Sequence, residues 1–155
     1  MARLAKVITV SDGVVEGVRE DRSGDALAAH LAAHGFDVVE RSTTADGTDA
    51  VADTLRAACA GFTGLVVTTG GTGFGPRDLT PEGTRAVLER EAPGLAEAMR
   101  LISPLGRLSR AMAGTVGEAL VLNTPGSTTG CIETLDAVLD VVPHALELLA
   151  GGRPH

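Results

Sequence analysis

Short apolar runs rich in β-branched residues alternate along this chain with longer stretches of helical periodicity. The runs are Lys6–Val10, Phe36–Glu40, Leu65–Thr69 and Ala119–Asn123. Runs without regular polar alternation are typical of strands buried on both faces, and strand–helix alternation favours parallel pairing. The sequence therefore predicts an α/β fold, a three-layer α/β/α sandwich with a mostly parallel sheet, in which residues 1–155 form a single domain.

The stretches between these runs carry helix start and stop signals. Asp21–His34 is rich in alanine, with a start near Ser23 and Gly35 just past its end. A further helix is predicted at Thr80, with Thr80 as N-cap and Pro81 at the first helical position. The remaining predicted elements are helices at Asp49–Ala60, at Pro93–Ile102, after Asn123–Gly130 and at Pro143–Ala150, and an extended arm at Arg110–Glu118 that turns at Gly117.

Charge and composition exclude several classes of function. The chain has 20 Asp and Glu against 13 Lys and Arg, a formal net charge of -7, which disfavours non-specific nucleic-acid binding. It has 3 Phe and no Trp or Tyr, so it lacks the aromatic side chains on which the bases of single-stranded nucleic acids stack. Its apolar runs are too short for a membrane span or a signal sequence, so we expect no membrane partner and a cytoplasmic location. Cys59 and Cys131 are interpreted as small buried hydrophobes.

Polar loops follow each of the predicted strands. They are Ser11–Gly13, Ser42–Asp46, Gly70–Asp78 and Asn123–Ser127. In open α/β sheets, ligands bind beyond the carboxyl ends of the strands, so these loops are expected to converge on one site.

The loop TTGGTGFGPRD, residues 68–78, is the strongest local signal for ligand binding. Its glycines let the backbone approach a ligand and direct several N–H groups toward an anion. It is not a Walker A loop, because the only lysine of the chain is Lys6. The candidate nucleotide- or phosphate-binding residues are Ser11, Asp12, Gly70, Gly71, Thr72 and Gly73. A nicotinamide-dependent oxidoreductase stays open as an alternative, although the glycine spacing differs from the dinucleotide fingerprint.

Two aspartates in these loops are candidate catalytic and Mg²⁺-binding residues. Asp78 follows the glycine loop and Asp46 follows the second strand. Mg²⁺ is typically held by one or two carboxylates together with phosphate oxygens. Each residue also has a plain structural interpretation, Asp78 as a carboxylate at a helix start and Asp46 as a turn residue before Gly47.

Other polar residues are weaker candidates. The segment NTPGST places hydroxyl groups at a helix start, which would favour an anion, and Ser109–Arg110 could add a further anion contact. His30 and His34 are four residues apart on a predicted helix and could bind a metal, but a solvated helix face is the favoured interpretation.

The segments VSDG, DRSGDAL, TTGGTGFGPRDLTPE, PGLAEAMR, LSRAMAG and LNTPGS occur in this order. Together they resemble the Mog/MoaB family of molybdenum-cofactor biosynthesis proteins, which includes the G domain of gephyrin. The resemblance runs nearly end to end. It implies a three-layer α/β/α domain that is usually trimeric, and a Mg²⁺-dependent adenylylation of molybdopterin by ATP that releases pyrophosphate.

The resemblance extends to single residues. Asp78 matches the catalytic aspartate of the family, and Asp46 matches its second aspartate, in an Ala-Asp-Gly context where the family has Pro-Asp-acidic. The positions that match molybdopterin-handling residues are Ser109, Asn123 and the loop Pro125–Gly126–Ser127, beside which Arg110 is a further candidate. Thr124 and Thr128 depart from the family pattern.

We therefore expect a molybdopterin adenylyltransferase with Mg²⁺ as cofactor and with ATP and molybdopterin as substrates. A non-catalytic molybdopterin-binding accessory protein of the MoaB type is the alternative. The resemblance also implies a homotrimer, and a molybdenum-insertion protein as the partner that receives the product. The segment around Ala96–Ile102 and Leu105 has more apolar side chains than one short helix needs to pack on a single core. This excess agrees with association between copies of the chain.

Overall fold

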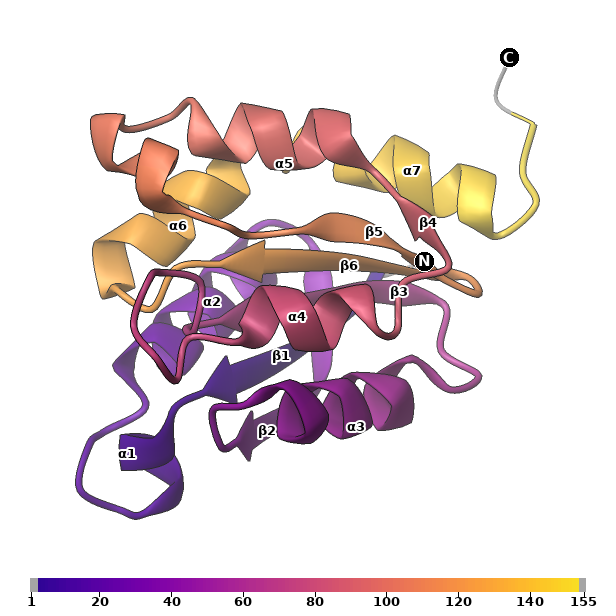
Figure 1. Ribbon diagram of the computed structural model, residues 1–155. Coiled ribbons are helices and arrows are strands. Elements are labelled where there is room, and N and C mark those ends of the chain that lie inside the picture. The colour runs from indigo at the N-terminus through magenta and orange to yellow at the C-terminus, as the bar shows by residue number, and fades with distance from the viewer. Residues whose placement is uncertain (1–2, 154–155) are drawn as a thin grey trace.

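The computed structural model describes residues 3–153, and in this range six strands form one sheet in the order β2-β1-β3-β6-β5-β4 (Figure 1). The strands are β1 (Arg3–Val10), β2 (Phe36–Thr44), β3 (Gly64–Thr69), β4 (Arg90–Glu91), β5 (Ala113–Val116) and β6 (Ala119–Thr124). The first four strands of the sheet order are parallel, while β5 pairs antiparallel with both β6 and β4. The predicted mostly parallel sheet is confirmed.

Helices cover both faces of the sheet. They are α1 (Asp12–Val15), α2 (Arg22–Ala33), α3 (Thr48–Cys59), α4 (Thr80–Arg85), α5 (Pro93–Arg100), α6 (Thr128–Asp136) and α7 (Val142–Leu149), with a 3₁₀ helix at Pro104–Leu108. One apolar cluster joins the sheet to α2, α5, α6 and α7, and a second joins it to α3 and to the segment that follows α4. Figure 1 shows α3 and α4 on one side of the sheet and α5 and α7 on the other. The three-layer α/β/α sandwich is therefore confirmed.

Strand side chains alternate between these two clusters. Leu65 and Val67 of β3 pack in the first cluster, whereas Val66 between them packs in the second. Because both faces are covered, every residue of β3 and β6 is buried. This burial explains why the predicted strands are continuous apolar runs.

The edge strand β2 is longer than predicted. The run Phe36–Glu40 continues through Ser42 to Thr44, where the sequence had predicted a polar loop. An edge strand is paired on one side only and tolerates polar side chains, and Thr44 still pairs with Val10. Ala5 pairs with Val38 and Lys6 with Glu40, so Val39 is an extra residue that forms a bulge.

Several predicted element ends are corrected. Leu79, not Thr80, is the N-cap of α4, because the Thr80 hydroxyl donates instead to the Gly70 carbonyl oxygen at 2.9 Å. Asp21 caps α2 by accepting from the Gly24 N–H. The loop predicted at Ser11–Gly13 begins the short helix α1, and α5 ends at Arg100 rather than Ile102. The predicted turn at Gly117 is confirmed, with a φ of 57° between β5 and β6.

Lys6, the only lysine of the chain, lies far along β1 from the glycine loop. Its ammonium group donates to the Ala58 carbonyl oxygen at 2.9 Å, near the carboxyl end of α3, and lies 4.3 Å from the centre of the Phe62 ring. A cation is favourable at a helix carboxyl end and over an aromatic face. Lys6 therefore has a structural role, which agrees with the absence of a Walker A loop. No helix within residues 3–153 is long and apolar enough to cross a membrane.

The cysteine thiols should be inert in the folded protein. Cys59 and Cys131 are both free and buried, and burial raises the pKa of each thiol to about 11. Near neutral pH the fraction of each cysteine that is ionised to thiolate should then be roughly a hundredfold lower than for an ordinary cysteine. We expect a thiol reagent such as DTNB to label neither cysteine in the native state and both in guanidinium chloride. Rapid native labelling of either would contradict this assignment.

Candidate active site

A cavity of about 800 Å³ lies beyond the carboxyl ends of β1, β3 and β6. The predicted residues that line it are Ser11, Asp46, Gly70, Gly71, Asp78, Gly126 and Ser127. The polar loops therefore converge, as parallel strands require. Thr72 and Gly73 belong to the same glycine loop but do not line this cavity.

The glycine loop has a backbone conformation that side chains would prevent. Gly70 has a φ of 103° and Gly71 a φ of 69°, both in the region that favours glycine. A Cβ at Gly70 would collide with the Val10 carbonyl oxygen, and one at Gly71 with the Thr80 hydroxyl. The Gly70 N–H donates to the Thr124 carbonyl oxygen at 3.0 Å, so it fixes the loop and is not available to an anion. The N–H of Gly71, by contrast, has no partner among the described residues.

Arg110 shapes this loop, and its predicted contact with molybdopterin stays a prediction. Its Nε donates to the Gly73 carbonyl oxygen at 2.9 Å, and Nη2 donates to the Asp78 carbonyl oxygen. Its Nη1 pairs with the Glu82 carboxylate at 2.6 Å, and this hydrogen bond lowers the Glu82 pKa. The backbone N–H of Arg110 also donates to the Thr72 carbonyl oxygen. The guanidinium therefore holds the two ends of the loop at a fixed separation.

Asp12 and Asp46 exchange a pair of hydrogen bonds. The Asp12 N–H donates to Asp46 Oδ2 at 2.9 Å, and the Asp46 N–H donates to Asp12 Oδ1 at 3.0 Å. Arg77 donates to both oxygens of the Asp12 carboxylate, at 2.9 and 3.1 Å, and to the Asp46 carbonyl oxygen. Asp12 thus orients Asp46, and its contact with phosphate stays a prediction. Arg77 is likewise engaged in protein contacts.

The two candidate catalytic carboxylates each keep one oxygen available. Asp46 uses Oδ2 to accept from Asp12, and Asp78 uses Oδ2 to accept from the Gly75 N–H at 2.8 Å. No residue within 3–153 donates a hydrogen bond to Oδ1 of either side chain. Both side chains are half-buried and line the same cavity. Anchored carboxylates with a spare hard oxygen fit the ligand preference of Mg²⁺.

Asn123 is buried among protein partners and lies outside the cavity, although it was predicted to contact molybdopterin. It is 0% exposed. Its Nδ2 donates to Thr68 Oγ1 and Thr84 Oγ1, both at 3.0 Å, and its Oδ1 accepts from the Met112 N–H. The side chain therefore positions β3, β6, α4 and the segment before β5.

A second cavity of about 320 Å³ adjoins the first. Ser109, Pro125 and Ser127 line it together with the apolar side chains of Met99, Ile102 and Leu105. Ser127 lines both cavities and caps α6 by accepting from the Gly130 N–H at 3.0 Å. The predicted anion-favouring helix start is therefore located where the two cavities meet.

The two departures from the family pattern differ in position. Thr124 is buried, and its hydroxyl donates to the Thr68 carbonyl oxygen at 2.8 Å, so it replaces an apolar residue without entering either cavity. Thr128 lines the larger cavity.

Sequence reasoning missed one wall of the larger cavity, formed by residues 19–23, which lead from α1 into the first turn of α2. The stem of Arg19 packs over Gly13, and its guanidinium makes no ion pair with any residue in the described range. Asp21 accepts from the Thr9 hydroxyl at 2.7 Å and pairs with Arg41, so its charge is compensated. The available signal was the dense run of charges directly after the first strand and its loop.

Residues 6–144 match the sequence model of a family described as the probable molybdopterin binding domain. The chain belongs to this family. A molybdopterin adenylyltransferase of Helicobacter pylori strain J99 is 37% identical over 152 residues, which cover 94% of this chain and 86% of that protein. The family assignment leaves no support for a nicotinamide-dependent oxidoreductase. That alternative rested on glycine spacing alone, and α4 begins only at Thr80.

Solved structures of family members have the same fold. The molybdopterin biosynthesis enzyme MoaB of Thermus thermophilus superposes with a TM-score of 0.89 at 44% identity, covering 96% of this chain and 97% of that one. The molybdopterin biosynthesis Mog protein of Mycobacterium ulcerans has a TM-score of 0.89 at 40% identity, with coverages of 96% and 99%. The α/β fold and the family resemblance are therefore both confirmed.

Removing the Asn123 amide should destabilise the fold strongly. In Asn123→Ala, the Met112 N–H loses its side-chain acceptor and two buried threonine hydroxyls lose a donor. Unsatisfied buried groups make a loss of about 2–4 kcal/mol in the free energy of unfolding the expected result. Urea denaturation measures it, with Asp37→Ala on the exposed face of β2 as a control that should change stability little. Equal stabilities of the two variants would refute the structural role.

Arg77 should control the titration of Asp12. The Arg77 hydrogen bonds lower the Asp12 pKa. The pairing therefore stabilises the folded state at a pH above the ordinary aspartate pKa, and this stabilisation is lost as the pH falls through the Asp12 pKa of the folded protein. In Arg77→Gln, we expect the Asp12 pKa to rise toward its ordinary value in a carboxyl carbon NMR titration. Arg22→Gln is the control, because Arg22 pairs with Glu20 instead. An unshifted Asp12 titration in Arg77→Gln would overturn the assignment.

Proposed function

We propose that this chain is a molybdopterin adenylyltransferase, which transfers AMP from ATP to the terminal phosphate of molybdopterin and releases pyrophosphate. The observation that carries the proposal is the cavity at the strand ends, where two anchored carboxylates face the glycine loop in a chain of this family. Relatives that share nearly its whole length are named for this activity.

The reaction is a nucleotidyl transfer. An oxygen of the molybdopterin phosphate attacks the α-phosphorus of ATP, a new P–O bond forms, and the bond from the α-phosphorus to the bridging oxygen breaks. The electron pair of that bond leaves with pyrophosphate. Catalysis of such transfers comes mainly from positioning and from electrostatic stabilisation.

The residues of the larger cavity would orient the phosphates. The Gly71 N–H and the amino end of α6 at Ser127 present donors toward a bound anion. The Arg19 guanidinium adds a positive charge at the cavity wall. The smaller, more apolar cavity beside Ser109 and Pro125 would hold the pterin, with Ser127 between the two substrates.

We propose further that Asp46 and Asp78 hold Mg²⁺ through their available oxygens. When bound, Mg²⁺ would neutralise phosphate charge, which matters because an acidic protein must bring two polyanions together. The Asp12 and Gly75 hydrogen bonds keep the two carboxylates oriented before any substrate arrives.

The direct test supplies molybdopterin, ATP and Mg²⁺ to the purified protein. Adenylylated molybdopterin and pyrophosphate should appear in equal amounts. Molybdopterin that binds but is not converted would instead support the non-catalytic accessory protein, an alternative favoured by Thr128 at the cavity wall. Absence of both binding and turnover would reject both functions.

Neutralising either carboxylate should slow the transfer. We expect Asp78→Asn and Asp46→Asn each to lower kcat roughly 100- to 1,000-fold, because each removes charge stabilisation of the transition state. The double variant should lose less than the product of the single losses, since both groups act on one ion. Molybdopterin binding, measured by fluorescence, should survive and serves as the folding control. Turnover near the normal rate in Asp78→Asn would remove Asp78 from the mechanism.

A homotrimer is also part of the proposal. Leu101, Leu105 and Leu108, at the end of α5 and in the 3₁₀ helix, are 84%, 74% and 55% exposed. Closed symmetric association is the usual way to cover such a patch. Light scattering should give three times the 15.7 kDa mass of one chain, and Leu105→Asp should lower it. Leu148→Asp on α7 is the matched control that should leave it unchanged, and a monomeric wild-type protein would contradict the proposal.

The substrates and the product also bear on the location of the protein and on its partner. Both ATP and the nucleotide product point to the cytoplasm, which fractionation of cells would test. We propose that a molybdenum-insertion protein receives the adenylylated product.

A further inference from the structure

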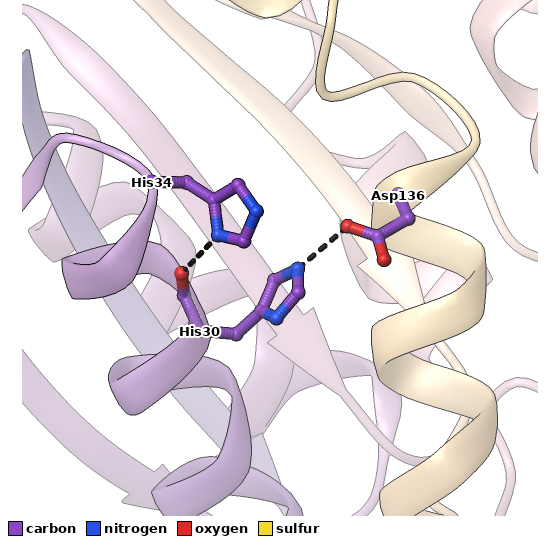
Figure 2. A group of neighbouring side chains, drawn as sticks. All are labelled: His30, His34 and Asp136. Carbon is purple, nitrogen blue, oxygen red and sulfur yellow. Dashed lines mark hydrogen bonds and ion pairs between the residues drawn. The ribbon is translucent and has the colours of Figure 1, made fainter.

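Two histidines and one carboxylate meet on the surface at the ends of α2 and α6, away from the cavities. His30 and His34 lie on successive turns near the carboxyl end of α2, and Asp136 is the last residue of α6. Figure 2 shows the three side chains directed toward one another across the space between the two helices. One ligand atom from each lies within 4.8 Å of the other two.

The hydrogen bonding of His34 leaves one nitrogen available to a metal. Its Nδ1 donates to the His30 carbonyl oxygen at 2.7 Å, which places the ring proton on Nδ1 and a lone pair on Nε2 (Figure 2). Histidines that bind metals typically donate their other N–H to a carbonyl or carboxylate in this way. The backbone of α2 thus fixes both the tautomer and the orientation of His34.

The other two side chains are already paired. His30 Nε2 lies 2.6 Å from Asp136 Oδ1. A tetrahedral metal with bonds of about 2.0–2.2 Å would separate these atoms to about 3.4 Å. The half-exposed Asp136 side chain can make that movement without disturbing the core. The proton on His30 Nε2 would then leave for Nδ1 or solvent as the metal takes its place.

We propose that His30, His34 and Asp136 form a binding site for a divalent transition metal of the zinc type. Two imidazole nitrogens and one carboxylate oxygen suit Zn²⁺, Ni²⁺ or Cu²⁺ and disfavour Mg²⁺, which prefers oxygen ligands. The site is therefore chemically distinct from the pair of aspartates in the larger cavity. Water would complete the coordination.

The bound metal would fasten α2 to α6. Both helices begin at the larger cavity, α2 beside Asp21 and Ser23 and α6 beside Ser127, and the metal site lies at their opposite ends. Cross-linking these ends removes relative motion of the two helices, so metal binding raises the stability of the fold by linkage. It also restricts movement at the two helix starts that line the cavity.

The test uses the untagged full-length chain, freed of metal with EDTA. In a calorimetric titration, one Zn²⁺ per chain should bind in a way that requires the histidines. Bound Zn²⁺ should also raise the Tm of the protein. Co²⁺ at the same site should give the visible absorption of a low-coordinate nitrogen-ligated ion. We expect His34→Gln and Asp136→Asn each to weaken Zn²⁺ binding at least tenfold. Both residues are exposed, so the variants should fold, which circular dichroism confirms.

Two controls separate this site from the others. His144→Gln, on the exposed surface of α7, should bind Zn²⁺ as the wild type does. The double variant Asp46→Asn/Asp78→Asn should also keep the histidine-dependent equivalent and the Co²⁺ spectrum. The proposal is overturned if the wild type binds no Zn²⁺, or if His34→Gln binds it as well as the wild type. Loss of binding in the double aspartate variant alone would likewise overturn it.

Discussion

The geometry around the cavity depends on the hydrogen bonds of the buried Asn123 amide. This amide hydrogen-bonds to Thr68 on β3, Thr84 on α4 and the backbone of Met112, at the point where the apolar strands give way to polar loops. Buried polar groups are costly when unpaired, so such a network permits few alternative arrangements. The glycine loop begins after Thr69, the residue that follows Thr68 in β3. The Thr80 hydroxyl, which donates to the Gly70 carbonyl oxygen, belongs to the same helix as Thr84. The position of the loop therefore follows from the packing beneath it.

Above this network, the acidic side chains around the cavity differ in how their charges are paired. Asp12 is neutralised by Arg77, and Asp21 is neutralised by Arg41. Asp46 and Asp78 instead each accept one backbone hydrogen bond from the described residues. An acidic protein can handle polyanionic substrates if its remaining negative charges act through a cation, which is the division of roles proposed here.

The sequence predicted the fold and the convergence of the polar loops, because both follow from local patterns. Apolar runs mark strands buried on two faces, and polar loops after parallel strands must meet at one edge. It did not predict the polar end of β2, because this segment is kept in the sheet by pairing with β1 and not by hydrophobic side chains. It also did not predict the protein contacts of Arg110, Asp12 and Asn123. Their side chains bond to partners far away in the sequence, and no local pattern distinguishes a residue that supports a loop from one that binds a ligand.

The two edges of the sheet have a consequence for how the chain behaves at high concentration. On one side the sheet ends in β4, which is two residues long. On the other it ends in β2, where Glu40 and Arg41 are exposed and the bulge at Val39 interrupts the regular ladder. Open edges invite pairing with strands of other chains, and short length, charge and bulges each oppose it. The chain can therefore keep a continuous apolar sheet at its centre without offering a template for aggregation.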